Sequence, residues 1–316
     1  MQHQQSDRTP SQNNGNAVRS VRRWSATAIL SWGFSLFAAG AFGAVAVTLL
    51  VQSWPAWKHE GANFLTGTQW FYRQDSFGAA PMIFGSIAVA LVALAAAAPV
   101  GIGAAVFAVE FLPPRLRLGL KVGVELLAGI PSVVYGLLGI LILRDWVYEA
   151  LAAFDPLSGD TLLTAGVLLA VMILPTIMTL SDDALRGVPS SQRMAARGLG
   201  LTATETVFSV SLPQAFPGLL AAVLLALGRA LGEMIAVFLV VGRQDNQWPV
   251  SFLSLRPLAE AGQTLASKLG SAETNIAYGA PLHWGAMMGL ALVLLGLVLF
   301  VVLAATWLRR LRQQHL

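Results

Sequence analysis

Two ionisable side chains, Arg229 and Glu233, lie inside one apolar stretch of the chain, residues 214–242. A charge near the centre of a bilayer costs about 2.5–3.5 kcal/mol on insertion scales, and such residues generally face a bundle interior or an aqueous path. Because the two residues are four positions apart, we expect them to lie on one face of a single helix. A guanidinium binds two oxygens of an oxyanion at once, and a neighbouring carboxylate can hold it when no anion is bound. The pair therefore indicates a bundle interior or an aqueous path along this helix.

A third charge, Glu125, lies in another apolar stretch, residues 118–143. We predict that Glu125, Arg229 and Glu233 line the substrate path. A second interpretation stays open, in which the three charges neutralise one another and serve only to hold helices together.

The composition indicates what must position these charges. The 316 residues are 56% hydrophobic and only 11% charged, whereas soluble domains carry about 25% charged residues. Because a helix needs about 20 apolar residues to cross the hydrocarbon layer, we predict an all-α polytopic membrane protein with six transmembrane helices. The predicted spans are residues 26–51, 82–109, 118–143, 162–180, 214–242 and 284–308. The transmembrane domain is expected over residues 25–316, after a disordered cytoplasmic tail over residues 1–24 that is too polar to fold alone.

The distribution of basic residues orients these spans. Of the 20 lysine and arginine residues, 13 fall on the side of the two termini, six fall on the opposite side, and Arg229 lies inside a span. The positive-inside rule then places both termini and the loop 182–213 in the cytoplasm. On the other side, residues 52–81 carry several aromatic residues, Trp70 among them, and are typical of an interfacial aromatic belt.

The loop before the fifth span reads as two short helices with a sharp corner. The sequence Thr202-Ala-Thr-Glu205 predicts a capping box, in which the threonine hydroxyl and the glutamate carboxylate satisfy free amides at a helix start. Gly198 and Gly200 favour a break before it, because glycine adopts positive φ without a Cβ penalty.

The spacing in this loop resembles the EAA loop of ABC-importer permeases. The matching residues are Met194, Ala195, Ala196, Gly200, Leu212 and Pro213. Met194 stands where that family usually carries glutamate, which puts one polar contact to a partner ATPase in doubt. The resemblance implies that these residues couple the chain to an ATPase. An ordinary amphipathic loop is the alternative.

Two intramembrane motifs resemble those of phosphate-specific ABC-importer permeases of the PstC type. They are GRALGEMIAV, which contains Arg229 and Glu233, and ELLAGIPSVVYG, which begins at Glu125. The resemblance implies a type I ABC-importer permease fold in the cell inner membrane, with inorganic phosphate as substrate. It also implies partners: a homologous permease subunit of the PstA type, two ATPase subunits and an external phosphate-binding protein.

Several other functions are disfavoured by the residues present. None of the three lysines follows a glycine, as the lysine of a P-loop must, so we expect ATP to be bound by a partner subunit and this chain to be neither an enzyme nor a cofactor protein. With no cysteine and scattered histidines, we predict no metal site. The net charge of +4 comes mostly from residues flanking the spans; it suits membrane lipid, and we expect no nucleic-acid partner.

Three alternatives stay open. The chain could be a permease for another oxyanion, or the sister subunit of a phosphate importer. It could be a secondary transporter that uses Glu125 and Glu233 to carry protons down an ion gradient. It could also be a membrane scaffold that transports nothing, although its intramembrane charges would then have no purpose.

Overall fold

The structure is a computed structural model that describes residues 26–152, 156–249, 251 and 254–313. The expected cytoplasmic tail, residues 1–24, lies outside the described residues. The chain divides into two compact units, Met1–Ala46 and Val47–Leu316, and the first helix, α1 (Ala26–Glu60), begins in one and ends in the other. In the first unit the apolar side chains of Trp32 and Phe37 are exposed, 58% and 76% respectively.

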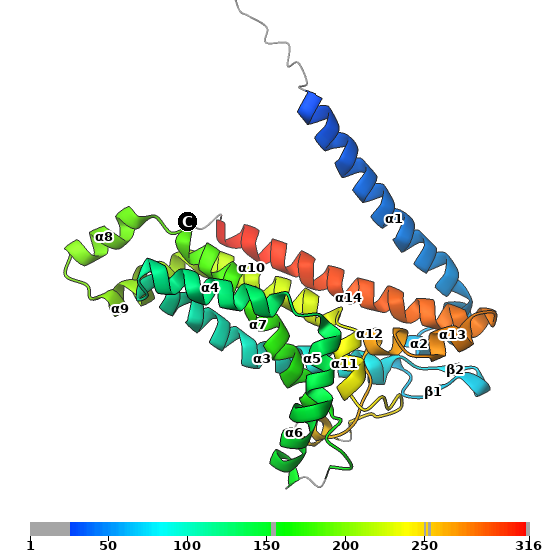
Figure 1. Ribbon diagram of the computed structural model, residues 1–316. Coiled ribbons are helices and arrows are strands. Elements are labelled where there is room, and N and C mark those ends of the chain that lie inside the picture. Colours follow the sequence, from blue (N-terminus) through cyan, green and yellow to red (C-terminus); the bar gives the residue numbers. More distant parts are fainter. Residues whose placement is uncertain (1–25, 153–155, 250, 252–253, 314–316) are drawn as a thin grey trace, which may run out of the picture. The chain divides into compact units, whose positions relative to one another are not determined.

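Four long apolar helices build the second unit (Figure 1). They are α3 (Ala80–Glu110), α7 (Leu162–Arg186), α10 (Leu212–Leu231) and α14 (Pro281–Gln313). Among the described residues, five helices including α1 are long and apolar enough to cross a membrane, or six if one bent pair counts as a span. The predicted all-α polytopic class is therefore confirmed.

The core lies where α3, α7 and α10 pack together, and α14 packs against α10. Small residues permit this close approach. They are expected at contacts between helices in lipid, where the hydrophobic effect does not drive helices together and close packing must do so. A Cβ atom added at Gly166 of α7 would lie 2.5 Å from Cγ1 of Val92 in α3, and one added at Gly101 would lie 2.9 Å from Cγ2 of Ile177. The glycines therefore set the separation of the two helices.

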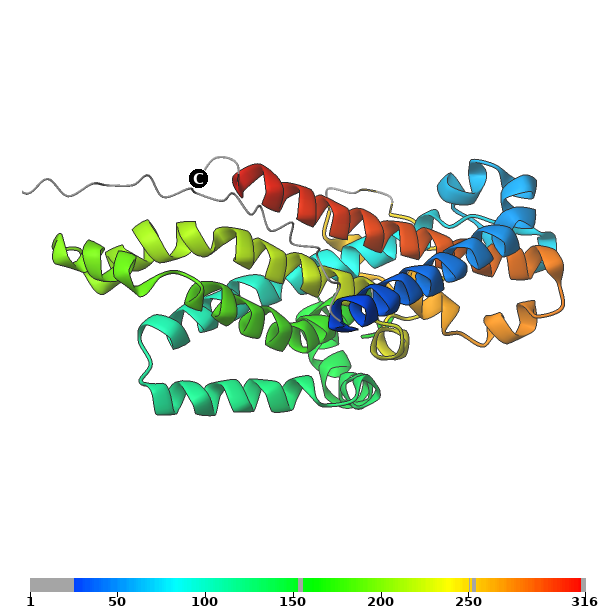
Figure 2. The same cartoon turned by 90° about the horizontal axis from the view of Figure 1, so that it is seen from above.

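The third predicted span is not one straight helix. It consists of α4 (Pro114–Ala128), α5 (Ser132–Leu138), the π-helical turn η2 (Gly139–Leu143) and α6 (Arg144–Ala150). The chain bends by 87° between α4 and the segment that begins at Ser132. Pro131 lacks an N–H group and keeps the residue before it out of helical geometry, which explains the bend. In Figure 2, α4 runs alongside the bundle as a separate helix.

One end of the second unit carries a small β-hairpin and short helices. Strands β1 (Trp70–Phe71) and β2 (Ser76–Phe77) pair antiparallel, with Trp70 opposite Phe77. The other elements here are α2 (Asn63–Thr66), η1 (Tyr72–Gln74), η5 (Arg256–Ala259), α12 (Leu265–Leu269) and α13 (Glu273–Ala277). We call this part the hairpin end.

The sequence predicts that Trp70 belongs to an exposed aromatic belt, but in the structure its side chain is buried. Its side chain is only 3% exposed and packs edge-on against Phe77, with ring centroids 5.1 Å apart. Its indole Nε1 donates a hydrogen bond to Glu273, 2.7 Å away, so the polar edge of the ring is satisfied inside the protein. Trp54, by contrast, is 67% exposed, as a belt residue is expected to be.

The predicted helical loop forms the opposite end of the second unit, which we call the loop end. It consists of α8 (Ser190–Gly198), α9 (Ala203–Thr206) and the π-helical turn η4 (Val207–Ser211), which leads into α10. The capping box of Thr202 and Glu205 is present. Gly200 adopts φ +93°, which confirms it as the corner, whereas Gly198 is the last helical residue of α8.

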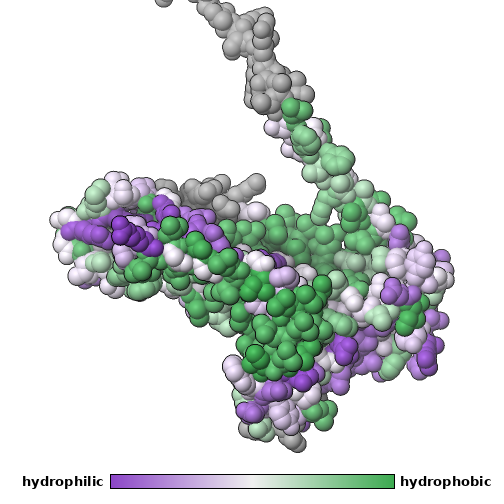
Figure 3. Space-filling model, in the orientation of Figure 1, coloured by the Kyte–Doolittle hydropathy of each residue, from purple (hydrophilic) through white to green (hydrophobic). Residues whose placement is uncertain are grey.

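The hydropathy of the surface follows this division (Figure 3). Hydrophilic colours gather over the loop end and over the loops of the hairpin end, and the helices between them are mostly hydrophobic. Such a band is what a bilayer covers in a membrane protein.

Candidate transport path and coupling site

The helix that was expected to carry both Arg229 and Glu233 is interrupted between them. Helix α10 ends at Leu231, residues 232–234 are not helical, and α11 (Ile235–Val240) then begins. The prediction that both charges share one face of a continuous helix is therefore wrong. Glu233 lies at this break and caps the start of α11: its Oε1 accepts a hydrogen bond from the backbone N–H of Ala236 at 3.3 Å. A negative carboxylate at the start of a helix interacts favourably with the positive end of the helix dipole.

Arg229 is exposed in the last turn of α10. Its Nη1 donates a hydrogen bond to Oγ1 of Thr176 in α7, 3.3 Å away. Among the residues that the structure describes, Arg229 forms no ion pair with Glu233 or with Glu125. Its guanidinium is therefore exposed and has no carboxylate partner among the described residues, on a helix otherwise apolar enough to cross a membrane.

Glu125 lies on α4, apart from Arg229. Its side chain is 55% exposed, and its cationic neighbour is Lys121, 4.0 Å away on the same helix. Lys121 also reaches Asp183 of α7 at 4.0 Å, so it bridges the two helices. The structure therefore does not bring together the three charges that the sequence singled out.

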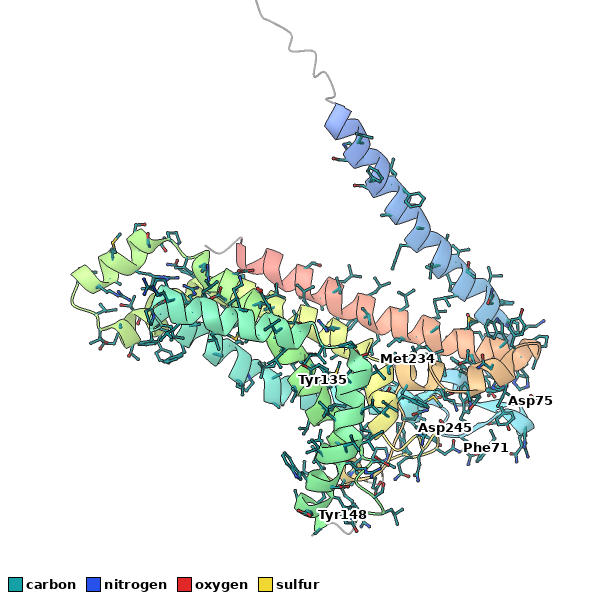
Figure 4. The ribbon with its side chains drawn as sticks, in the orientation of Figure 1. Phe71, Asp75, Tyr135, Tyr148, Met234 and Asp245 are labelled. Carbon is teal, nitrogen blue, oxygen red and sulfur yellow. The ribbon has the colours of Figure 1, made fainter. Side chains whose placement is uncertain are left out.

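Tyr135 was missed by the sequence reasoning, and it holds the bend between α4 and α5. It is buried, and its hydroxyl donates a hydrogen bond to the carbonyl of Leu127 at 2.9 Å, across the bend at residues 129–131. It also lies close enough to Arg229 for an electrostatic interaction. Figure 4 labels Tyr135 at the start of the segment that leaves the bundle, and Met234 at the helix break.

The loop end carries exposed apolar side chains in α8, at the residue that follows it and in η4. Met194 is 66% exposed, Leu199 is 84% exposed and Phe208 of η4 is 68% exposed. The other residues matched to the EAA pattern divide into exposed and anchored ones: Ala195 and Gly200 are exposed, Ala196 is buried, and Leu212 and Pro213 form the first turn of α10. Proline suits this first turn, where its missing N–H leaves no bond unmade. An apolar surface of this kind on a polar loop suits a protein partner.

One buried carboxylate anchors this loop. Glu110, the last residue of α3, has a side chain only 2% exposed. Its oxygens lie 3.3 Å from Arg193 and 3.7 Å from Arg197, both in α8, and Ser211 donates a hydrogen bond to it at 2.9 Å. We call these four residues the Glu110 cluster. The sequence held one signal of it: the two arginines are four residues apart, on one face of a helix.

A second buried carboxylate joins α4 to α7. Asp182 has a side chain 7% exposed and lies 2.6 Å from Arg117 of α4 and 2.9 Å from Arg186 of its own helix. The start of the bent α4–α5 pair is therefore fixed to the end of α7.

The hairpin end holds a buried lysine. Lys268 of α12 is 2% exposed; its Nζ lies 2.5 Å from Asp245, also pairs with Glu273, and sits 5.3 Å from the ring centre of Trp70. Nε2 of His283 lies 2.9 Å from Glu273. We call these five residues the Lys268 cluster; Figure 4 labels Asp245 within it.

The pKa values of the two carboxyls of this cluster are shifted in opposite directions. Burial raises the pKa of Asp245, and the positive charge of Lys268 offsets only part of that effect. Burial also acts to raise the pKa of Glu273, but the hydrogen bonds from Lys268, Trp70 and His283 outweigh it, and the net pKa is lowered. Glu273 is therefore the carboxylate that the cluster holds ionised most firmly.

Residues 97–313 match the family described as the binding-protein-dependent transport system inner membrane component. The chain belongs to this family. The matched segment contains Glu125, the helix break beside Arg229, the α8–α9 loop and the Glu110 cluster. Trp70 of the Lys268 cluster lies outside it.

Curated relatives in this family carry closely related names. The phosphate transport system permease protein PstC of Mesorhizobium japonicum is 34% identical over 82% of this chain and 80% of its own length. The protein of the same name from Haemophilus influenzae is 32% identical over 85% and 86%, respectively. PstC 2 of Mycobacterium tuberculosis is 34% identical over 83% and 84%.

Solved structures confirm the fold. The inward-facing MetNI methionine ABC transporter contains a chain that matches with a TM-score of 0.53 and 20% identity, covering 72% of this chain and 92% of that one. The fold is that of an ABC-importer permease. As a binding-protein-dependent inner membrane component, the chain is a multi-pass membrane protein and a permease subunit.

Proposed function

We propose that this chain is the permease subunit of an ATP-driven phosphate importer. The observation that carries the proposal is the similarity to proteins named phosphate transport permeases over more than four fifths of the chain. The chain would form the translocation path with a homologous permease subunit. Two ATPase subunits would supply energy, and an external phosphate-binding protein would deliver the substrate.

Arg229 is the residue proposed to meet phosphate. Inorganic phosphate carries one to two negative charges near neutral pH, and the planar guanidinium matches two of its oxygens. The hydroxyl of Thr176, 3.3 Å from Arg229, adds a second polar group at the same point. Because the arginine has no carboxylate partner among the described residues, an arriving anion has no ion pair to break. In another conformation Glu233 or Glu125 would take the place of the anion and keep Arg229 from holding it.

The loop end is proposed to dock on the ATPase from the cytoplasm. The distribution of basic residues supports a cytoplasmic position for this loop and both termini. Met194 and Leu199 offer the exposed apolar contact, and Gly200 and the capping box fix the angle between α8 and α9. The chain itself carries no lysine in a P-loop context, so we place the ATPase site in the partner subunits.

Reconstitution tests this proposal against the other substrate classes. The permease is purified with its partner permease, the ATPase subunits and the binding protein, and is incorporated into liposomes with ATP inside. We expect phosphate uptake that requires ATP and the binding protein, together with phosphate-stimulated ATP hydrolysis. Uptake of sulfate or molybdate in place of phosphate would assign another oxyanion. Uptake that follows a proton gradient without ATP would contradict the proposal.

A further inference from the structure

The Glu110 cluster joins both sides of the α8–α9 loop to one point of the bundle. Arg193 and Arg197 belong to α8, at the entry to the loop, and Ser211 ends η4, at its exit. All three meet the same carboxylate at the end of α3. Arg193 also donates a hydrogen bond to the carbonyl of Leu185 in α7. The loop is thereby fixed to the bundle through polar contacts.

A buried carboxylate is an unusual means of attachment, because removing it from water costs several kcal/mol unless cations and donors surround it. Among the described residues, the cations and the hydroxyl donor that surround the Glu110 carboxylate all come from the α8–α9 loop and η4. The contact is not sealed, however, since Arg197 is 49% exposed and its distance to the carboxylate is 3.7 Å. An interaction of this length can shorten or lengthen with modest cost, which a packed apolar contact cannot do.

Helix α3 leads from this cluster into the core. It packs along α7, which holds Thr176, and against α10, which carries Arg229. A displacement of α8 that pulls on Glu110 would therefore move the helix that supports both groups at the proposed anion site. The opposite, exposed side chains of the loop, Met194 and Leu199, remain available to a partner while the arginines face the bundle.

We infer that Glu110 is a positioning residue that transmits movement of the α8–α9 loop to α3, and so couples ATP hydrolysis in a partner to the state of the anion path. The inference rests on the proposed function, because it requires a partner that moves the loop. It assigns a mechanical role to a residue outside both the loop and the path.

The test compares Glu110→Gln with the wild type in the reconstituted complex. Glutamine keeps the size of the side chain and a partner for Ser211 but removes the charge that attracts the two arginines. The quantity measured is phosphate transported per ATP hydrolysed, per assembled complex. We expect this ratio to fall about fivefold or more, the lower end of measured coupling effects between sites. A purely structural role would lower the amount of assembled complex and leave the ratio unchanged.

Two further variants protect the test. Asp145→Asn removes a carboxylate that is 68% exposed on α6 and should leave the ratio at its wild-type value. If Glu110→Gln fails to assemble, the double variant Glu110→Gln/Arg193→Gln removes the charge of Glu110 together with that of the nearer arginine, and the same ratio is measured on it. A wild-type ratio in either assembled Glu110 variant overturns the inference.

A substrate-independent measurement separates this inference from the proposed function. Hydrogen exchange is followed in α8 and at the end of α3 while a non-hydrolysable nucleotide binds the ATPase subunits. In the wild type we expect exchange to change in both segments, and in Glu110→Gln only in α8. If the wild-type complex imports no phosphate but shows this pattern, the proposed substrate is wrong and the role of Glu110 stands. An unaltered response of α3 in the variant refutes the role of Glu110, whatever the substrate.

Discussion

Each end of the second unit has a network built around a buried charge, Lys268 at the hairpin end and Glu110 at the loop end, but the two networks differ. At the hairpin end Lys268 lies 2.5 Å from Asp245, pairs with Glu273 and faces the ring of Trp70. At the loop end Glu110 has arginines at 3.3 and 3.7 Å and a single hydrogen bond, from Ser211. Both central side chains are 2% exposed.

The surroundings make the same distinction. The ring of Tyr72 stacks on His283 at 5.2 Å, and Trp70 packs on Phe77, so aromatic groups enclose the Lys268 cluster. Arg197 of the Glu110 cluster remains half exposed. A short, enclosed network holds one arrangement, whereas a longer and partly hydrated one permits several. We therefore expect the hairpin end to be the more rigid of the two and the loop end to be the part that moves.

The largest effect is expected from Lys268→Met. The change leaves Asp245 and Glu273 buried without their cation, and breaking a buried ion pair from one side costs about 3–5 kcal/mol. Thermal unfolding in detergent, followed by tryptophan fluorescence, measures the loss, and much of the variant should fail to fold. Lys58→Met, at an exposed position near the end of α1, is the matched control. Equal melting temperatures for both variants would show that the Lys268 cluster is not a support.

A smaller loss of stability is expected from Glu110→Gln. Arg197 keeps much of its hydration when the carboxylate is neutralised, so the cost should be about 1–2 kcal/mol, between that of an exposed and a buried pair. The same unfolding measurement gives the value. If Glu110→Gln destabilises the chain as much as Lys268→Met does, the two ends do not differ in rigidity.

Gly200→Ala tests the corner of the loop end alone. A Cβ at this residue would have nothing within 4 Å, so the only penalty is the backbone conformation at φ +93°. That penalty is about 1–2 kcal/mol for a residue with a side chain. We expect a larger fractional loss of transport than of melting temperature, because the substitution changes the angle between α8 and α9. Equal transport by this variant and wild type would remove the corner from the coupling mechanism.

The smallest effect concerns acid. The pKa of Glu273 is lowered in the folded protein, so its contribution to stability is complete above the unfolded value of about 4.3 and is lost as the pH falls through the folded value. The raised pKa of Asp245 acts in the opposite sense, because stability then increases as the pH falls from the folded to the unfolded value. The melting temperatures of the wild type and Glu273→Gln are compared over a pH range that begins at about 6 and extends about two pH units downward. The wild type should lose more stability in acid; a parallel decline in both would contradict the assignment.

Sequence reasoning succeeded where the information is local. The apolar length of α3 and α7, the capping box at Thr202 and the corner at Gly200 each depend on a few neighbouring residues, and all were confirmed. It failed at the helix break after Leu231, because an uninterrupted apolar run hides a break that Glu233 stabilises from within.

Contacts between distant segments were beyond its reach. The spacing of Arg193 and Arg197 places them on one face of a helix, but nothing in the sequence indicates that this face meets Glu110, far away in the chain. The buried Trp70 likewise donates its indole hydrogen bond to Glu273, which lies 203 residues later in the chain. The candidate coupling residues were found because they form a local motif, whereas the carboxylate that anchors them was not.

The central claim is that an exposed arginine on α10 binds the transported phosphate. It is tested most directly by phosphate uptake into liposomes containing the complete complex with Arg229→Gln, beside Arg256→Gln, which removes an arginine with a side chain 73% exposed in the hairpin-end loop. The account predicts assembled complexes in both cases, with uptake lost in Arg229→Gln and retained in Arg256→Gln. Uptake by Arg229→Gln near the wild-type rate would contradict it.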